Sequence, residues 1–489
     1  MSRDGLTLGA LFPEARGAPA ALPVAGLTAD SRTVAPGVVF VAVPGSAADG
    51  RRFAAQAAAA GAAAMVAEGP RPADLPEPVA YLAVADARRA LALAAARLHP
   101  GQPAAIVAVT GTSGKSSVAD FVRQILGRLG REAASLGTLG VITTGGAAYG
   151  SLTTPDPISL HATLDRLARD GITDLAMEAS SHGIAQSRLD GVRLAAAGFT
   201  NLGHDHLDYH HTPEAYLAAK LRLFETLLPE GATAVVNADG AEAGRVAAAA
   251  RARGLTVATT GRAGETLRLV SARTHGFSQA LAVAAAGETH AVDLPFVGAF
   301  QVENALLAAG LVLAMPAGRG RTREVIAALG HLAGVPGRLE RVGQVRDALC
   351  VVDYAHKPEA LAGVLDALRP FTTGRLVCVM GCGGDRDRAK RPLMGGIAAG
   401  RADRVIVTDD NPRGEDPALI RAAILAAAPG AEEIGDRAEA IRAAVRDLAA
   451  GDVLVVAGKG HETGQIIGDR MLPFSDRDAV LSAIEETRA

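Results

Sequence analysis

Lysine is scarce in this sequence. Of the 49 basic residues only five are lysines, at positions 115, 220, 357, 390 and 459, and all the others are arginines. Lysine is a compact charge whose neutral amine can react, whereas arginine is a planar fork that stays charged. A lysine in this background therefore indicates a position where arginine would not serve. Lys390 is the exception, because it stands beside Arg388 and Arg391 and is interpreted as a solvated surface residue.

Other scarcities exclude whole classes of function. The chain has no tryptophan, 3% aromatic residues and a net charge of −3, so it offers neither the stacking platforms nor the basic surface of a nucleic-acid-binding protein. Residues 1–23 do not have the pattern of a signal peptide, and no apolar run approaches the roughly 20 residues that span a bilayer. Cys350, Cys378 and Cys382 lie in apolar segments and are expected to be buried free thiols in a reducing cytoplasm.

The 489 residues predict about three domains. Clusters of Gly and Pro at 99–103 and 334–337 interrupt the chain, which gives predicted domains at 1–100, 101–335 and 336–489. In the last domain four apolar strands, at 349–352, 376–380, 405–408 and 453–457, each lead into a polar motif. Fully apolar strands favour parallel sheets covered on both faces, and open α/β sheets bind ligands at the carboxyl ends of their strands. The predicted fold class is α/β throughout.

A phosphate-binding loop is predicted at residues 110–117, Thr-Gly-Thr-Ser-Gly-Lys-Ser-Ser. It follows the apolar strand 104–109 and opens a helix, so that backbone N–H groups and the helix N-terminus can face an anion. Lys115 would neutralise the phosphates, and Ser116 could hold Mg²⁺. The loop is shorter than the general pattern, whose first glycine would fall at Val109.

Glu178 and the His- and Asp-rich segment 201–211 lie farther along the same predicted domain. A histidine cluster invites a zinc interpretation, but this segment has no thiolates. Oxygen ligands such as Glu178 and Ser116, beside phosphates, suit Mg²⁺ better. The sequence therefore favours a magnesium–nucleotide site.

Taken together, these motifs resemble the Mur ligase family. The resemblance runs in order through the chain, from Asp30-Ser31-Arg32 to Glu462. It rests on these segments: 110–117, Glu178 with 180–182, 205–210, Lys220, 337–340, 353–356, 410–413 and 458–462. It implies an N-terminal domain for a UDP-sugar, a central P-loop ATPase-like domain and a C-terminal Rossmann-like domain that carries the incoming amino acid.

The resemblance also implies three sets of binding residues. Those for the sugar-peptide are Ser31, Thr153, Thr154, Ser180, Gln186 and Arg188. Those for ATP are Gly111, Thr112, Ser113, Gly114, Lys115, Ser116 and Ser117, with Asn304, Arg338 and Asp353. Those for the amino acid are Arg386, Asp410, Asn411, Pro412, Arg413, Gly458 and Glu462. Two positions depart from the family pattern: Gln301 replaces a more usual Asn after the Gly298-x-Phe300 motif and is left out of the site, and Ser46 replaces a more usual His near the uridine.

The implied reaction is ATP-dependent amide ligation. A phosphoryl group passes to the D-Glu side-chain carboxylate of UDP-N-acetylmuramoyl-L-Ala-D-Glu, and the amine of meso-2,6-diaminopimelate attacks the acyl phosphate. Lys115, Lys220, Glu178 and His206 are the expected catalytic residues. Mg²⁺ would be held by Ser116, Glu178, His206 and a carbamate on Lys220. The enzyme would serve cytoplasmic peptidoglycan precursor synthesis, as a monomer without nucleic-acid partners.

Three other interpretations stay open. A ligase that adds L-lysine would differ mainly at 410–413, and another Mur-type ligase such as folylpolyglutamate synthase would lack that motif. A P-loop ATPase acting as a switch or motor belongs to a different class. Arg413 itself could be a solvated loop residue or a partner of Glu415 rather than a ligand for a carboxylate.

Overall fold

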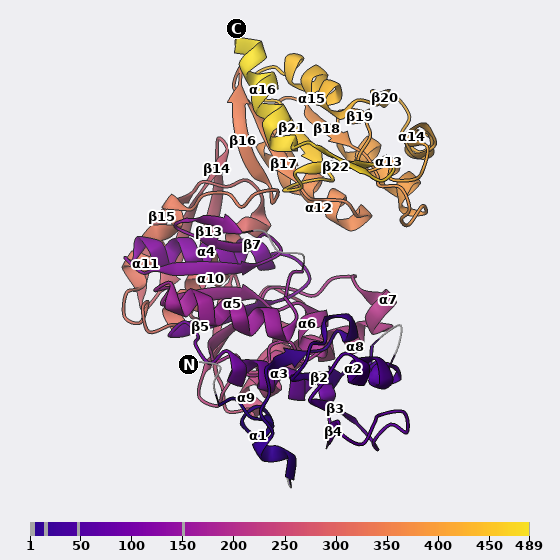
Figure 1. Ribbon diagram of the computed structural model, residues 1–489. Coiled ribbons are helices and arrows are strands. Elements are labelled where there is room, and N and C mark those ends of the chain that lie inside the picture. The colour runs from indigo at the N-terminus through magenta and orange to yellow at the C-terminus, as the bar shows by residue number, and fades with distance from the viewer. Residues whose placement is uncertain (1–4, 14–17, 46–48, 149–151, 489) are drawn as a thin grey trace. The chain divides into compact units, whose positions relative to one another are not determined.

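The computed structural model describes residues 5–13, 18–45, 49–148 and 152–488 (Figure 1). Ser46 lies outside the described residues. The chain divides into two compact units, one of residues 1–266 with 307–325 and the other of 267–306 with 326–489. The helices α10 (Ala299–Ala314) and α11 (Thr322–Ala328) each contribute residues to both units. The three-domain boundaries stay a prediction.

The first unit begins with a four-stranded parallel sheet in the order β1-β2-β3-β4. Its strands are β1 (Gly26–Thr28), β2 (Val38–Ala42), β3 (Ala64–Glu68) and β4 (Ala80–Val84), and its helices are α1 (Leu8–Leu11), α2 (Ala54–Ala59) and α3 (Ala87–Leu98). Side chains of β2, β3 and α3 share one buried cluster with Leu8 and Leu11. Short apolar runs of the sequence at 38–43, 63–67 and 79–84 coincide with β2, β3 and β4 to within a residue or two at each end.

The larger sheet of the first unit has the order β12-β11-β10-β5-β9-β6-β7-β8, parallel except for the β6–β7 and β7–β8 pairs. The strands are β5 (Ala105–Thr110), β6 (Ala133–Gly137), β7 (Gly140–Thr143), β8 (Gly146–Ala148), β9 (Asp174–Glu178), β10 (Leu194–Phe199), β11 (Thr233–Asn237) and β12 (Thr256–Gly261). The helices are α4 (Lys115–Arg128), α5 (Pro157–Arg169), α6 (Ser181–Ala185), α7 (Leu207–His210), α8 (Pro213–Arg222) and α9 (Ala243–Ala252), and a π-helical turn follows α8 at Leu223–Leu227. The central strands β10, β5 and β9 are neighbours, so residues that follow their carboxyl ends meet at one edge of the sheet.

The second unit contains an antiparallel meander, β13 (Leu267–His275), β14 (Ser278–Ala285) and β15 (Glu288–Leu294). It also contains a six-stranded sheet in the order β16-β17-β21-β18-β19-β20, in which only the β16–β17 pair is antiparallel. Its strands are β16 (Glu340–Val345), β17 (Ala348–Asp353), β18 (Leu376–Met380), β19 (Arg404–Val407), β20 (Glu432–Glu433) and β21 (Val453–Ala457). Its helices are α12 (Pro358–Leu368), α13 (Lys390–Arg401), α14 (Pro417–Leu425), α15 (Arg437–Arg446) and α16 (Asp476–Arg488), with a hairpin of β22 (Gly464–Ile467) and β23 (Arg470–Pro473).

Both faces of the six-stranded sheet are buried. Leu349 and Val351 of β17 belong to one apolar cluster, which includes residues of α12, α13 and α14. Cys350 and Val352 belong to another, which includes residues of α15 and α16. Successive side chains of a strand point to opposite faces, so an unbroken apolar strand is what a doubly covered sheet requires. The four predicted strands of this domain are confirmed.

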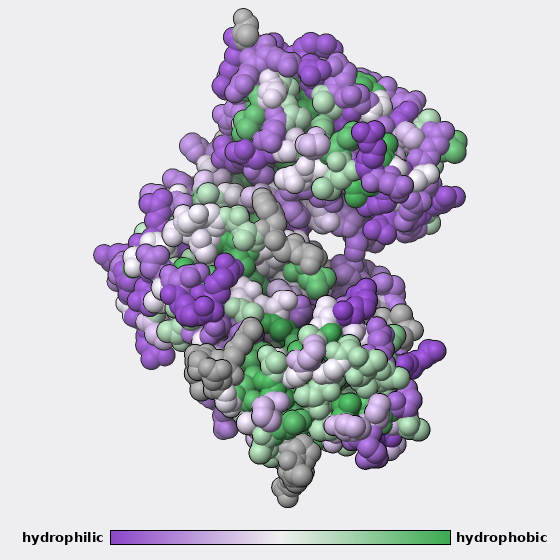
Figure 2. All heavy atoms as spheres, in the orientation of Figure 1, coloured by the Kyte–Doolittle hydropathy of each residue, from purple (hydrophilic) through white to green (hydrophobic). Residues whose placement is uncertain are grey.

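Hydrophilic residues cover much of the face drawn in Figure 2, with hydrophobic patches between them. Among the helices that the structure describes, none is long and apolar enough to cross a membrane. Cys350, Cys378 and Cys382 are buried and free, as predicted. Burial raises the pKa of Cys350 and Cys378 to about 12.

Candidate active site

Two glycines shape the loop between β5 and α4. Gly111 has φ +147°, and a Cβ placed there would overlap Thr200 Oγ1. Gly114 has φ +85° and precedes the first residue of α4, Lys115. Positive φ angles are readily adopted only by glycine. The loop therefore turns tightly enough to leave the helix N-terminus facing its concave side, as an anion site requires.

The end of β10 braces this loop. Thr200 Oγ1 donates to Ser113 O at 2.7 Å, Asn201 Oδ1 accepts from Ser113 N at 3.0 Å, and Asn201 O accepts from Thr112 N at 2.9 Å. Sequence reasoning did not assign Thr200 and Asn201 to the site. The signal was available, because both follow the carboxyl end of a strand that neighbours β5.

Two lysines reach the same loop. Lys115 Nζ donates to Gly111 O at 3.0 Å and to Thr112 O at 2.8 Å. Lys220 Nζ comes from α8 and donates to Gly111 O at 2.8 Å, and its side chain is only 1% exposed. Burial, together with the charge of Lys115, holds the pKa of Lys220 well below its usual value. Both effects shift Lys220 toward its neutral amine relative to an exposed lysine.

The Lys220 amine also lies 4.2 Å from the centroid of the Tyr216 ring. This ring belongs to an aromatic group in which neighbouring centroids are 4.2–6.1 Å apart, formed by His182, His206, Tyr209, His210 and Tyr216. Burial lowers the pKa of His182 and of His210. His206 has φ +55° and precedes α7. This predicted metal ligand therefore lies at a turn of the chain, and its ring is 6.1 Å from that of Tyr216, which the Lys220 amine contacts.

Glu178 ends β9 and is 2% exposed. Its Oε1 accepts from Thr138 N at 2.8 Å, and its Oε2 is 3.4 Å from Thr138 Oγ1. Gly137 lies so close that a Cβ there would overlap the carboxylate. These contacts fix the carboxylate at the same sheet edge as Ser116, which follows β5.

The predicted magnesium ligands include the types of side chain that commonly bind this ion. Glu178 is the last residue of β9, and Ser116 and His206 come after β5 and β10. Mg²⁺ is commonly held by one or two carboxylates together with phosphates and water. Across the described ranges, no group of three or more His, Cys, Asp and Glu side chains is arranged to hold a metal by itself. A carbamate on Lys220 would add oxygens that no encoded side chain at that position could supply, and its N–H could keep the bond to Gly111 O.

Four of the predicted sugar-peptide residues form one network. Thr154 Oγ1 donates to Glu178 O at 2.9 Å and accepts from Ser180 N at 3.0 Å, and Arg188 NH1 donates to Thr154 O at 2.6 Å. Gln186 Oε1 accepts from Arg188 NH2 at 2.7 Å. Burial lowers the pKa of the Arg188 guanidinium.

The other two sugar-peptide residues are held separately. Thr153 joins the network through Thr138, with 3.0 Å between the two hydroxyl oxygens. Ser31 lies in the short 3₁₀ turn Ser31–Thr33 beside the four-stranded sheet, where its hydroxyl donates to Gln56 Oε1 at 3.3 Å. No contact joins Ser31 to the other five in the part of the chain that the structure describes.

In the second unit, Asn304, Arg338 and Asp353 lie close together. Asn304 Nδ2 donates to Gln301 Oε1 at 3.1 Å, and Gln301 Nε2 donates to Arg338 O at 3.1 Å. Asp353 accepts from Leu339 N at 2.7 Å, and burial raises its pKa. Gln301 was left out of the predicted site because it departs from the family pattern, yet it links two predicted nucleotide residues.

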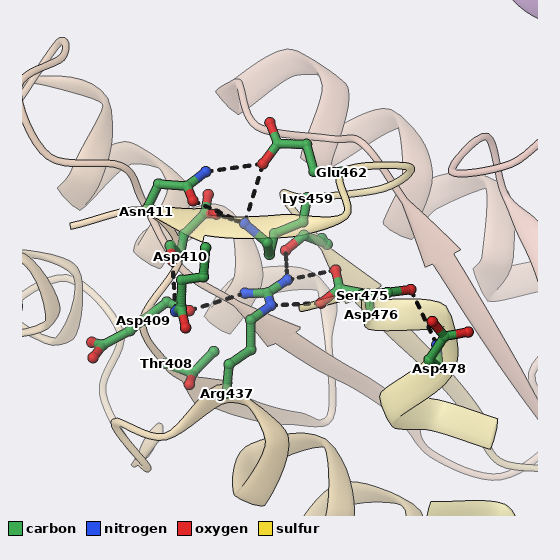
Figure 3. Close-up of polar contacts among 12 residues, drawn as sticks. Thr408, Asp409, Asp410, Asn411, Arg437, Lys459, Glu462, Ser475, Asp476 and Asp478 are labelled. Atoms are coloured by element: carbon green, nitrogen blue, oxygen red, sulfur yellow. Dashed lines mark hydrogen bonds and ion pairs between the residues drawn. The ribbon is translucent and has the colours of Figure 1, made fainter. Parts of the chain in front are cut away.

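Four of the predicted amino-acid residues, Asp410, Asn411, Gly458 and Glu462, lie around Lys459, after the ends of β19 and β21 (Figure 3). Lys459 Nζ lies 3.4 Å from Asp410 Oδ1, 3.0 Å from Asn411 Oδ1 and 3.1 Å from Glu462 Oε2. Asn411 Nδ2 also donates to Glu462 Oε2 at 2.9 Å. A Cβ at Gly458 would lie 3.3 Å from Asp410 Oδ2, so this glycine keeps the space beside that carboxylate open.

Arg413 is half-buried, with φ +51°. Its NH1 donates to Gly384 O at 3.0 Å and is 3.4 Å from Asn411 O. The alternative pairing with Glu415 is not observed, since Glu415 instead binds Arg391 at 2.9 Å and Arg388 at 3.1 Å. The Arg391 hydrogen bond lowers the pKa of Glu415 to about 2.

Arg386 is exposed on the loop that leads to α13. The interpretation of Lys390 as a solvated surface residue was wrong, because Lys390 is half-buried and its Nζ donates to His356 O at 2.8 Å. That contact spans 34 residues of sequence, so local charge pattern could not reveal it.

Comparison with known proteins identifies the family. Residues 23–99 match "Mur ligase family, catalytic domain", residues 109–312 match "Mur ligase middle domain", and residues 337–460 match "Mur ligase, glutamate ligase domain". The chain belongs to the Mur ligase family. The predicted resemblance is therefore confirmed, as is the mixed α/β fold.

Individual relatives are similar along nearly the whole chain. UDP-N-acetylmuramoyl-L-alanyl-D-glutamate–2,6-diaminopimelate ligase of Bradyrhizobium diazoefficiens is 57% identical over 471 residues, which cover 95% of this chain and 96% of the relative. A solved structure of a ligase of the same name is 33% identical, with a TM-score of 0.74, and covers 99% of this chain and 100% of its own. The MurF ligase of Thermotoga maritima in complex with ADP is 20% identical, with a TM-score of 0.59 over 95% of this chain and 98% of its own, and so shares the fold.

Proposed function

We propose that this Mur ligase adds meso-2,6-diaminopimelate to the D-Glu side-chain carboxylate of UDP-N-acetylmuramoyl-L-Ala-D-Glu, with ATP as co-substrate. The single observation that carries the choice of amino acid is the pairing of opposite charges at the end of β19. Asp410 and Glu462 provide carboxylates that can bind an ammonium group. Arg413, three residues after Asp410, provides a guanidinium that can bind a carboxylate. The far end of diaminopimelate carries both groups. The name of the 57%-identical relative supports the same substrate.

The phosphate loop would bind ATP. Both reactants of the first step are anions, so catalysis depends on positioning and on neutralising charge. Lys115 would turn from the loop carbonyls to the phosphates, while backbone N–H groups at the start of α4 hold them. Asn304, Arg338 and Asp353 of the second unit would hold the rest of the nucleotide. A bound Mg²⁺ would supply further positive charge to the phosphates.

The sugar-peptide network would deliver the acceptor carboxylate. Arg188 and Gln186 are already held in position by Thr154 O and by each other, so little side-chain freedom is lost when they bind an anionic peptide. Thr153 and Ser180 would complete this site, and Ser31 would contact the UDP end. Glu178 is fixed by Thr138, which suits a ligand that must hold a metal at one place.

Lys220 would act as a carbamate. Its lowered pKa favours the neutral amine that carbon dioxide requires. The carbamate would be a negatively charged group near Lys115, because both lysines contact Gly111 O. A negative charge is what a ligand for Mg²⁺ provides. We expect the enzyme to act as a monomer in the cytoplasm, where its ATP and UDP-linked substrates are made and used.

Phosphate release tests the proposal directly. The purified protein is given ATP with the UDP-dipeptide and either diaminopimelate or L-lysine, and each substrate is then omitted in turn. We expect turnover only with all three substrates and only with diaminopimelate. Equal rates with L-lysine would refute the amino-acid assignment, while rapid hydrolysis of ATP alone would favour a switch or motor. Lys115→Ala is the background control.

A further inference from the structure

Lys459 is fully buried, with 0% of its side chain exposed. It stands between Gly458 at φ +119° and Gly460 at φ +55°. A Cβ at Gly460 would lie 2.7 Å from the Tyr354 Cβ. Two glycines in the left-handed region let the chain turn directly after β21, and this turn aims the Lys459 side chain at the end of β19.

The Lys459 ammonium meets one acceptor for each of its three N–H groups. The acceptors are Asp410 Oδ1, Asn411 Oδ1 and Glu462 Oε2, each from a different side chain. Arginine would bring five donors in a flat fork. A compact charge with three divergent donors is what this arrangement needs, which explains a lysine in a chain that otherwise uses arginine.

Each carboxylate keeps one oxygen outside these bonds. Glu462 Oε2 accepts from both Lys459 and Asn411, and Asp410 Oδ1 faces Lys459. Within the described ranges, Glu462 Oε1 and Asp410 Oδ2 accept no hydrogen bond. Counting Lys459 as +1 and the two carboxylates as −1 each, the cluster carries a net charge of −1. One ammonium group of a ligand would neutralise it.

The floor of the cluster is rigid. The Arg437 guanidinium and the Asp476 carboxylate are both fully buried and joined by two hydrogen bonds, of 2.7 and 2.8 Å. Arg437 NH2 also donates to Ala457 O at 3.0 Å, directly before the Gly458 turn. This ion pair fixes the end of β21, so Lys459 enters the cluster from an anchored backbone.

We infer that Lys459 is a positioning residue for the amino-acid substrate. It holds Asp410, Asn411 and Glu462 so that Glu462 Oε1 and Asp410 Oδ2 stay free to bind the substrate ammonium, and it lowers the charge of the cluster to match a single cation. Lys459 itself does not touch the substrate. This role rests on the proposed amino-acid ligase activity and assigns a function to a residue outside the predicted site.

The test compares Lys459→Met, which removes the charge but keeps the length, with Lys459→Arg, which keeps the charge but changes the donor geometry. In both variants we expect the KM for diaminopimelate to rise roughly 30-fold or more, because the Met variant leaves the two carboxylates without their cation and the Arg variant displaces them with its larger fork. The KM values for ATP and for the UDP-dipeptide should stay within about twofold, since uniform binding at those sites is untouched. Arg442→Met is the matched control, because Arg442 also pairs with two carboxylates, Glu439 and Glu486, but at the surface.

The results that would overturn the role of Lys459 can be stated in advance. An unchanged KM for diaminopimelate in either folded variant overturns the inference, and so does an equal rise in all three KM values. If Lys459→Met does not fold, the charge-retaining Lys459→Arg decides. Failure of both to fold assigns Lys459 to the fold and also overturns the inference. If the wild type uses L-lysine instead, the substrate assignment fails separately, and the same comparison is made with that amino acid.

Discussion

Each of the two units contains a buried lysine, and the two lysines differ in their partners. Lys220 in the first unit has one neutral acceptor, Gly111 O, and a second cation, Lys115, nearby. Lys459 in the second unit has two carboxylates and an amide oxygen. Burial and the charge of Lys115 lower the pKa of Lys220, and the nearby Asp205 offsets this only in part, whereas a buried lysine with matched partners can organise them. We therefore propose that the same side chain serves as a reactive amine in one unit and as a fixed charge in the other.

The largest expected effect is at Lys115, the cation of the phosphate loop. Lys115→Ala should lower kcat by about 10²–10³-fold or more, because a charge aimed at the transferring phosphoryl group is lost. Lys115→Arg should not restore activity, since the larger fork does not fit a cradle closed by Gly111 and Gly114. Circular dichroism should show both variants folded. Near-normal turnover of Lys115→Arg would contradict the assignment.

Lys220→Ala should come next, with loss of most activity. The carbamate would be missing, and with it the oxygens that we assign to the metal. A short carboxylic acid added to this variant should restore part of the rate, because it can occupy the space left by the side chain. Steady-state rates with and without the acid measure this. Restoration in the Lys115→Ala variant as well would show that the acid acts elsewhere.

Arg413→Ala should act on one substrate only. The KM for diaminopimelate should rise steeply, while those for ATP and the UDP-dipeptide change little. Lost pairing of a partly buried charge costs about 2–5 kcal/mol, and the lower end, about 30-fold, is expected because Arg413 NH1 already binds Gly384 O. Arg388→Ala, beside the same loop, is the control. A rise in the KM for ATP of the same size would remove Arg413 from the amino-acid site.

The smallest effect concerns His461, next to the Lys459 turn. Burial and the nearby Arg338 lower its pKa to about 4. Between that value and the ordinary 6.5, the unfolded chain takes up a proton that the folded protein does not. Stability should therefore be greatest above pH 6.5 and fall as the pH drops toward 4. Denaturant unfolding at pH 7 and pH 5 should show a smaller loss for His461→Gln than for the wild type.

Much of this arrangement could be predicted from the sequence, because some signals are local. The strands at 376–380 and 453–457 coincide with β18 and β21, since unbroken apolar runs followed by polar motifs have few other interpretations. The phosphate loop was equally readable from Gly114, Lys115 and the apolar strand before it. Each of these depends on neighbours in sequence.

The remainder depends on contacts between distant residues. The strands β13–β15 were missed because polar residues such as Arg268 and Asp293 interrupt the apolar ones of β13 and β15, and β14 fully buries only every second residue. Lys459 stood in a recognised motif, yet its partners Asp410 and Asn411 lie 49 and 48 positions away. Gln301 was set aside as a departure, although its longer side chain reaches Arg338 O across 37 positions. Such roles follow from packing, which one sequence does not display.

Carbon-13 NMR of the protein in labelled bicarbonate tests the contrast between the two lysines most directly. Wild type should show one carbamate resonance, which Lys220→Ala abolishes and Lys459→Arg leaves in place, because burial lowers the pKa of Lys220 whereas Lys459 is hydrogen-bonded to two carboxylates. Activity should follow the same signal as bicarbonate is removed and returned. A fully active protein without that resonance, or a resonance that persists in Lys220→Ala and disappears with Lys459, would contradict the account.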